Sequence, residues 1–233
     1  MGGTANPVRP YAKTNRELRL STSTKGTTAN APTRAKGATM QAAKAAQTRK
    51  RLIDATVRCL VKYGYARATT PRVAEEAGLS RGAMMHHFEN GPALIKATIA
   101  ELHEKRLRAF RRAAEKPEHD VVALVETYWS QLQKPGFIAF HELVIAARTD
   151  KDLAAIMQPL QEEFWGRFND QAATLFPEWK VAPEQFELAM TLSQTMLEGM
   201  AIAVQTNSMS EDKVPLMLEQ LENQIRTLMP QAT

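Results

Sequence analysis

Apolar side chains recur every three to four residues along most of the chain after Thr48, which is the spacing of one face of an α-helix. Proline, glycine and short polar runs interrupt this pattern and separate the helical segments from one another. No segment alternates apolar and polar residues with the period of two that a half-buried strand requires. The pattern therefore predicts an all-α protein with helices over 48–63, 70–77, 80–88, 92–115, 119–133, 137–148, 151–175, 183–206 and 213–229.

Two of the predicted helices, 70–77 and 80–88, are short and are separated by a single glycine turn. Gly78 stands where such a turn needs a positive φ, and the small side chain of Ala74 allows the two helices to approach closely. This spacing favours a helix-turn-helix, whose second helix enters the major groove of DNA, over an ordinary helical corner. The apolar centre between the two helices is predicted to contain Val73, Ala77, Leu79 and Met84.

Residues 51–102 resemble the N-terminal domain of TetR-family transcriptional regulators in the order and spacing of their motifs. The resemblance implies a DNA-binding domain of three helices over 47–91. It also implies that 92–233 forms a connector helix followed by a helical domain that binds a small molecule and dimerises. The matching positions are Ala55-Thr56, Gly64-Tyr65, Thr69-Thr70, Val73-Ala74-Glu75-Glu76-Ala77-Gly78-Leu79-Ser80, His86-His87-Phe88 and Ala93-Leu94.

The start of the second short helix is the part expected to meet the DNA bases. Arg81 has the length and the planar fork for a bidentate contact to guanine, and a phosphate contact is the open alternative. Gly82 would let the helix approach the groove closely. The resemblance adds His86 as a phosphate contact. The predicted DNA-binding residues are Thr70, Arg72, Ser80, Arg81, Gly82, Met85 and His86.

Two positions depart from what is usual in the family. Met85 stands where an aromatic residue, commonly tyrosine, contacts the DNA backbone, and Gly91 stands where a lysine is usual. Some phosphate affinity is therefore expected to come from elsewhere in the chain. The basic N-terminal segment is the obvious candidate for supplying it.

Charge is distributed unevenly along the chain. Residues 1–50 carry ten Lys and Arg against one acid, 51–116 carry thirteen against seven, and 117–233 carry seven against seventeen. This asymmetry favours a polyanionic partner for the N-terminal part over chance clustering. Residues 1–46 also lack a hydrophobic period, so they are expected to form a disordered basic arm, with helix possible only near 42–47.

The C-terminal half is rich in large apolar side chains, most of which must form its core. Some are expected to line a cavity between helices, where ligands of helical bundles commonly bind. Two predicted helices, 183–206 and 213–229, carry apolar residues on more than one face. This favours a homodimer that covers the second face over a thick monomer core or a cavity wall. The predicted ligand-contacting residues are Trp129, Phe137, Phe140, His141, Trp165, Gln194 and Met196.

Several functional classes are excluded or disfavoured. The chain has no uninterrupted apolar stretch long enough for a membrane span and no apolar leader, so a cytoplasmic protein is expected. Its single cysteine, Cys59, cannot form an intramolecular disulfide framework. Adjacent His86 and His87 point about 100° apart on a helix and cannot share a metal ion. No catalytic or phosphate-loop motif is present, so neither an enzyme nor a cofactor is predicted.

These observations predict a ligand-responsive transcriptional repressor that acts as a homodimer on operator DNA and is released by a small apolar or amphipathic effector. Two alternatives remain open at this point. One is an architectural DNA-binding protein without an effector, which a well-formed cavity would disfavour. The other is a helical small-molecule-binding protein with a degenerate helix-turn-helix, which absence of DNA binding at low salt would favour.

Overall fold

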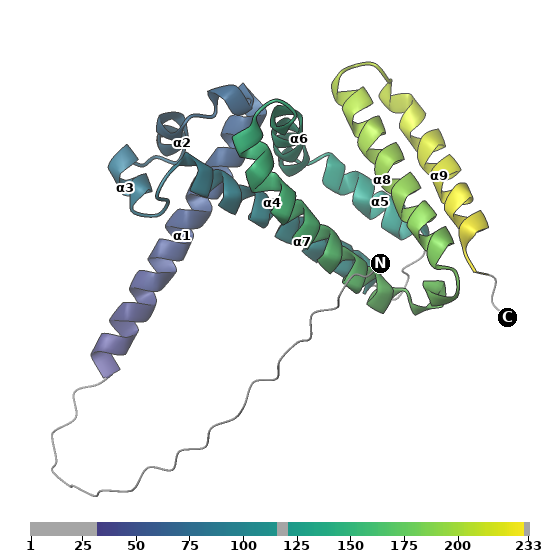
Figure 1. The fold of residues 1–233 in the computed structure, drawn as a ribbon, viewed down its shortest axis with the longest axis horizontal. Helices are drawn as coiled ribbons and strands as arrows, with labels where there is room; N and C mark the ends of the chain where they lie inside the picture. The colour runs from purple at the N-terminus through teal and green to yellow at the C-terminus, as the bar shows by residue number, and fades with distance from the viewer. Residues whose placement is uncertain (1–31, 116–120, 231–233) are drawn as a thin grey trace, which may run out of the picture. The chain divides into compact units, whose positions relative to one another are not determined.

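A computed structural model of the chain describes residues 32–115 and 121–230, and within these ranges the regular structure is entirely helical (Figure 1). The prediction of an all-α fold is confirmed. Three short 3-10 turns, Tyr65–Arg67, Pro177–Val181 and Glu211–Lys213, join longer helices. The α-helices are α1 (Pro32–Tyr63), α2 (Thr70–Glu76), α3 (Arg81–Met85), α4 (Gly91–Ala114), α5 (Val121–Leu132), α6 (Pro135–Ala147), α7 (Lys151–Leu175), α8 (Pro183–Gln205) and α9 (Val214–Leu228).

The first helix begins earlier than the hydrophobic pattern predicts. Helix α1 starts at Pro32, so the expectation of disorder is wrong for residues 32–41, whereas the helix that was allowed near 42–47 is present. Alanine, lysine and glutamine dominate residues 41–47, and their high intrinsic helix propensity compensates for the missing apolar stripe. The rest of the predicted arm, residues 1–31, lies outside the described residues.

The N-terminal helices α1–α3 and the start of α4 enclose one apolar cluster. Its members lie at helical spacing on each element, which is why the sequence pattern located most of them. Leu79 packs against the cluster and is itself partly buried. The fully or nearly fully buried members are Leu52, Ala55, Cys59, Val73, Ala74, Ala77, Met84, Phe88 and Leu94.

Two details of this region differ from the sequence prediction. The sequence Thr70-Pro71 predicts Thr70 as the N-cap of α2, but the N-cap is Thr69, and its hydroxyl makes no capping hydrogen bond. Helix α3 ends at Met85, earlier than the predicted residue 88. The chain turns there, which places the Phe88 ring in the apolar cluster. Gly78 has φ +64°, as the turn requires.

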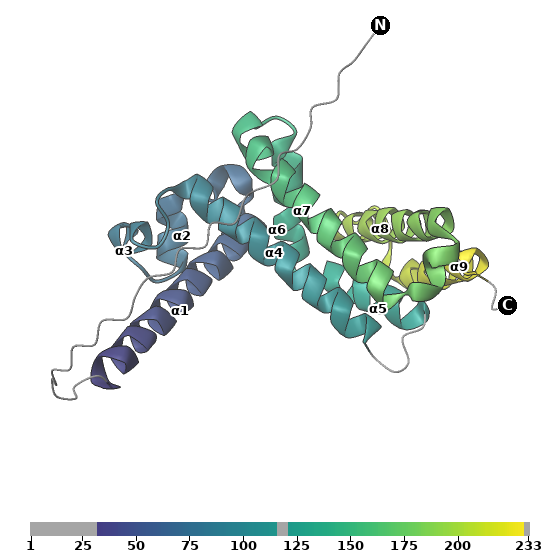
Figure 2. The same ribbon diagram turned by 60° about the horizontal axis from the view of Figure 1, so that its bottom comes forward.

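Helix α4 connects the N-terminal helices to the remainder of the chain, and Figures 1 and 2 show it running beside α7. A second buried cluster joins Leu60 of α1 to residues of α4, α6 and α7, including Leu102, Leu143 and Leu153. Residues 41–233 accordingly form one compact unit. Residues on both sides of the predicted boundary at residue 91 therefore share one core.

The C-terminal helices α8 and α9 form an antiparallel pair that packs on α5 (Figure 1). A third buried cluster holds them together and includes Val125 of α5, Leu197 of α8 and Leu221 of α9. Among the described residues, no helix combines the length and apolar character needed to cross a membrane.

Candidate functional site

Helix α3 presents one buried face and one exposed face. Met84 is fully buried and anchors the helix, whereas Arg81, Gly82, Met85 and His86 are exposed. The hydroxyl of Ser80 accepts a hydrogen bond from the backbone N–H of Ala83 at 3.1 Å, which makes Ser80 the N-cap of α3. The Arg81 side chain makes no hydrogen bond or ion pair within the described part of the chain. Its guanidinium is therefore available to a partner.

Two arginines of α1 hold the ends of the helix-turn-helix in place. The Arg51 guanidinium donates to the carbonyl of Ala77 at 2.5 Å, at the C-terminus of α2. Arg49 donates to the carbonyl of His87 at 2.5 Å, just beyond α3, and lies over the Phe88 ring at 4.2 Å. A cation at a helix C-terminus satisfies the last carbonyls and favours the helix dipole. These basic residues have a positioning role that charge counting alone does not reveal.

We expect Arg49→Ala to lower the free energy of unfolding by about 1 kcal/mol, because a charge-assisted hydrogen bond and a cation–π contact at a solvated site are lost. DNA affinity should fall as well, since the end of α3 loses its tie to α1. Thermal unfolding and DNA titration would measure the two effects. Lys44→Ala removes the same charge from an exposed site on α1 and should leave stability unchanged. Equal stability of the two variants would contradict the positioning role.

Arg72 is also held by the protein. Its guanidinium donates to the carbonyl of Arg67 at 2.9 Å and lies over the Tyr63 ring at 4.6 Å. Thr70 is partly buried, with its hydroxyl oxygen near Gly91. Both residues lie in the first turn of α2. Their side chains are therefore less free to contact DNA than that of Arg81.

A cavity of about 1010 Å³ lies among α4, α5, α7, α8 and α9. Aromatic rings dominate its wall, and several contact one another, such as Phe110 and Phe168 with centroids 4.5 Å apart. Large, largely apolar hollows with a few polar groups are typical of small-molecule sites. The aromatic residues that line it are Phe110, Tyr128, Phe164, Trp165, Phe168, Phe176, Trp179 and Phe186.

One polar cluster interrupts the apolar wall. The Tyr128 hydroxyl donates to a carboxylate oxygen of Glu198 at 2.8 Å, and the Arg106 guanidinium lies 3.4 Å from the same oxygen. Arg106 also lies over the Phe164 ring at 4.6 Å. Burial raises the pKa of Tyr128 far above its usual value, so the phenol stays protonated and remains a donor. Because Glu198 neutralises Arg106, this part of the wall carries no net charge.

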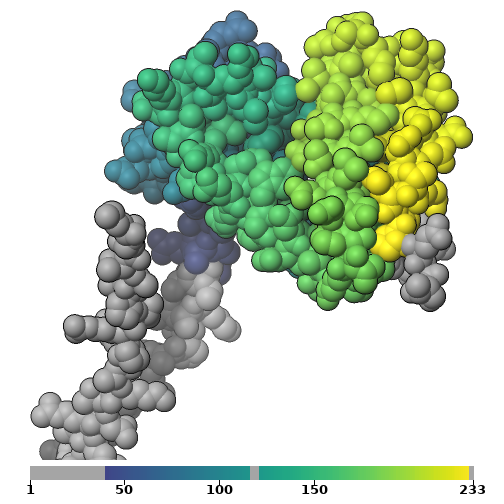
Figure 3. Space-filling view, turned by 45° about the vertical axis from the view of Figure 1, so that its right-hand side comes forward, coloured from purple at the N-terminus to yellow at the C-terminus, as the bar shows by residue number. Residues whose placement is uncertain are grey.

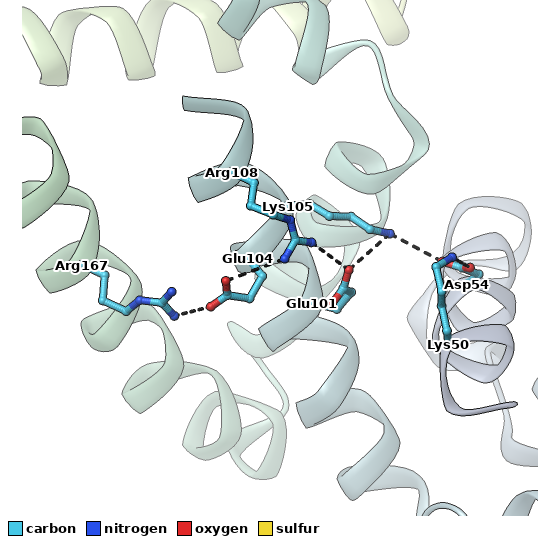
Figure 4. A network of polar contacts seen from close by, with 7 residues as sticks. All are labelled: Lys50, Asp54, Glu101, Glu104, Lys105, Arg108 and Arg167. Carbon is cyan, nitrogen blue, oxygen red and sulfur yellow. Dashed lines mark hydrogen bonds and ion pairs between the residues drawn. The ribbon is translucent and has the colours of Figure 1, made fainter. Parts of the chain in front are cut away.

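A chain of ion pairs crosses three helices, from α1 through α4 to α7 (Figure 4). It begins where Asp54 of α1 accepts from Lys50 at 2.5 Å and from Lys105 of α4 at 3.5 Å. The further pairs along α4 are Lys105–Glu101, Arg108–Glu101 and Arg108–Glu104, and the chain ends at Arg167 of α7, which pairs with Glu104. Partly exposed pairs are individually weak. Together they connect the N-terminal helices to the wall of the cavity.

Comparisons with known proteins agree with this arrangement. Residues 52–98 match the family model described as bacterial regulatory proteins, tetR family. An uncharacterized HTH-type transcriptional regulator of Mycobacterium tuberculosis is 27% identical over 177 residues, which cover 73% of this chain and 91% of the relative. The matched region contains the helix-turn-helix described above. Residues 52–98 belong to the TetR family of bacterial regulatory proteins.

Solved structures show the same fold. A TetR family transcription regulator from Marinobacter aquaeolei, 15% identical, superposes with a TM-score of 0.62 over 79% of this chain and 97% of its own. The multidrug binding protein EbrR, solved in complex with imidazole, is 24% identical and has a TM-score of 0.55 over 79% of this chain and 96% of its own. These likenesses show that the chain has the fold of TetR-family regulators.

In this TetR-family protein, only two of the predicted ligand residues line the cavity, Trp165 and Gln194. Trp129, Phe137 and Met196 pack against the C-terminal apolar cluster instead. Phe140 is buried and meets the buried His103 ring edge-on at 5.2 Å, and His141 stacks on Phe137 at 5.8 Å. These five side chains have packing partners that keep them away from the cavity wall.

The wall contains polar residues that sequence reasoning did not single out, notably Arg106 and Gln131. Arg106 lies among other charged residues on α4, such as Lys105 and Arg108, so the sequence there is typical of a solvated face. The signal that could have found it is its position opposite the aromatic residues of α7. That position can be recognised only when it is known which helices pack together, and the sequence pattern does not give this.

Proposed function

We propose that this TetR-family protein is a homodimeric repressor that leaves its operator when a small molecule binds in the cavity. The observation that carries the proposal is the aromatic-lined hollow of about 1010 Å³, because a protein that only bends or coats DNA has no use for it. The similar fold of EbrR, a multidrug binding protein, supports a ligand role for this architecture. No catalytic role is proposed for any residue.

On DNA, the dimer would place two α3 helices in successive major grooves, about one turn apart. Arg81 and Gly82 would face the bases, and Ser80, Met85 and His86 would lie near the backbone. Thr70 and Arg72 would contribute through the exposed N-terminus of α2. We further propose that the basic segment 1–31 supplies phosphate contacts in place of the lysine that Gly91 replaces.

Ligand binding would act on DNA affinity through α4 and α7, which both line the cavity. The same two helices are tied to α1 by the ion pairs of Figure 4. A ligand that fits better when α4 is displaced would favour a spacing of the α3 helices that does not match the operator. The size of this shift equals the difference in ligand affinity between the two states.

The proposal is tested by filling the cavity. Ala173 lies on its wall and is exposed, so Ala173→Trp should fold normally while occupying ligand space. Duplexes selected from a random pool supply the operator, and 2-naphthaleneethanol and decanol serve as neutral probes. We expect the probes to release the native protein from DNA and to be at least about tenfold less effective on the variant.

Gly166→Trp on the same helix is the matched control, because Gly166 is exposed, has open space at its Cβ position and lies outside the cavity wall. It should respond to the probes as the native protein does. Probe-induced release that is equal in both variants would contradict ligand control through this cavity. Absence of sequence-selective DNA binding by the native protein would contradict its proposed role as a transcriptional regulator.

A further inference from the structure

A second, smaller hollow of about 340 Å³ lies between α4 and α5. Its wall contains four cationic side chains, Lys105, Arg108 and Arg112 of α4 and Lys134 just after α5, and no carboxylate. Such a concentration of one charge sign favours anion binding. This hollow, called the basic groove below, lies outside the helix-turn-helix and is not needed to explain DNA recognition.

The basic groove adjoins the aromatic cavity. Three residues line both: Ala109 of α4, and Thr127 and Gln131 of α5. Small Ala109 presents little bulk at this junction, and the hydroxyl of Thr127 and the amide of Gln131 offer hydrogen bonds there. An apolar hollow and a cationic hollow therefore adjoin at these three residues.

The four cations of the groove are not equally available. Lys105 and Arg108 are already paired with carboxylates, at 3.5 Å to Asp54 and 3.1 Å to Glu101 respectively. Arg112 makes no ion pair within the described ranges. The Lys134 ammonium donates to the amide oxygen of Gln131 at 3.0 Å, a neutral partner. The uncompensated positive charge is thus concentrated on Arg112 and Lys134.

We propose that the effector is an amphipathic anion whose apolar, preferably aromatic, body fills the cavity and whose carboxylate or phosphate head lies in the basic groove. Arg112 and Lys134 would bind the head, and Gln131 would donate to it from the junction. This inference rests on the proposed ligand-responsive function and specifies the chemical class of the ligand. In the cavity Arg106 is paired with Glu198, and the other charged residues of the wall are Glu178, Glu187 and Arg226. The basic groove is therefore the part of the site with an excess of positive charge.

The position of the anionic head also explains how its binding would affect the DNA-binding helices. Lys105 and Arg108 line the groove and hold Asp54 and Glu101 in the ion-pair chain of Figure 4. An anion in the groove competes with those carboxylates for the same two cations. Its binding would weaken the tie between α4 and α1, and this would add to the displacement of α4 that a neutral ligand of the same shape causes.

Calorimetry with matched probes tests the ligand class on the full chain. The probes are 2-naphthyl phosphate, 2-naphthylacetate and 2-naphthaleneethanol, with decanoate and decanol as a second pair and inorganic phosphate as the head alone. We expect each anion to bind at least about tenfold more tightly than the alcohol with the same body. A preference between the phosphate and the carboxylate identifies the head group.

Two single variants distinguish binding in the basic groove from a general effect of positive charge. Arg112→Ala should remove most of the advantage of the anions and leave alcohol binding unchanged. Arg111→Ala deletes the same charge from the neighbouring exposed position, which does not line the groove, and should preserve the advantage. Ala173→Trp should weaken the naphthyl anions and alcohol together, because all three place their body in the same cavity.

Three outcomes would overturn the inference. Alcohols that bind as tightly as the anions would refute the anionic head while leaving ligand control of DNA binding intact. Inorganic phosphate that binds as tightly as naphthyl phosphate would show that the groove acts separately from the cavity. If no probe in either series binds with a Kd below about 1 mM, both the ligand class and the proposed function fail.

Discussion

Gly199→Arg is expected to convert the protein to monomers and to lower its affinity for operator DNA by at least about 100-fold. The affinity falls because two linked recognition helices bind far more tightly than one. Gly199 is exposed on α8, and a Cβ added there meets no atom within 4 Å. Arginine is a better helix former than glycine, so the fold of the monomer should tolerate the change.

The outer surface of α8 and α9 gives the reason for this expectation (Figure 3). Leu188 is 54% exposed and Leu216 is 68% exposed, although apolar side chains of this size favour burial. Thr191, Thr195 and Gly199 continue an exposed, uncharged stripe along α8. We infer that a second copy covers this stripe. A charge placed there occurs twice in a two-fold symmetric interface and is buried against its own copy.

Light scattering and DNA titration measure the two effects on the same sample. Gly166→Arg is the matched control, because it introduces the same side chain at an exposed helical glycine of α7 that also has open space at its Cβ. The control should remain dimeric and bind the operator normally. A dimeric Gly199→Arg protein with native affinity would exclude this face as the interface.

Arg81→Lys should lower the affinity for the selected operator by about 10- to 100-fold and leave nonspecific DNA binding nearly unchanged. A bidentate arginine contact to guanine is worth about 1–3 kcal/mol of discrimination, and lysine cannot reproduce the planar fork. The side chain is exposed at the first position of α3, where no interaction with the described part of the protein competes for it.

Arg81→Ala separates base recognition from phosphate contact, because it removes the charge as well as the fork. If Arg81 contacts a base, both variants lose selectivity at one operator position, and neither should change the number of counterions released by more than about one. Competition titrations with single-base variants of the operator at several salt concentrations would show this. Unchanged selectivity in both variants would assign Arg81 to the DNA backbone.

The sequence pattern located most helices to within a few residues, because proline, glycine and capping residues end or begin them at fixed positions. Ser80, Gly78 and the apolar residues around Ala74 occupy the places that local rules require. The wrong start predicted for α1 also results from relying on the hydrophobic pattern. Periodicity detects burial, and residues 41–47 are helical without being buried to a comparable degree.

The ligand cavity was less predictable because it depends on how helices pack against one another. Phe137, Phe140 and Trp165 are equally large and apolar in sequence, yet only Trp165 faces the cavity. Helix rotation and pairing decide which aromatic ring faces a hollow. Contacts such as Arg49 to the carbonyl of His87 are similarly hidden, since a basic residue gives no sign of a backbone partner 38 positions away.

The single cysteine of this chain, Cys59, gives it a native reporter of motion in the DNA-binding part. Its thiol is fully buried beside Val73 and Met84, and burial raises its pKa, so a thiol-labelling reagent reaches it only when these helices separate. The labelling rate of the unmodified protein therefore measures how often that region opens. Operator DNA should slow the labelling, and comparison of rates with and without an effector would show whether release from DNA loosens the domain internally or moves it as a rigid body.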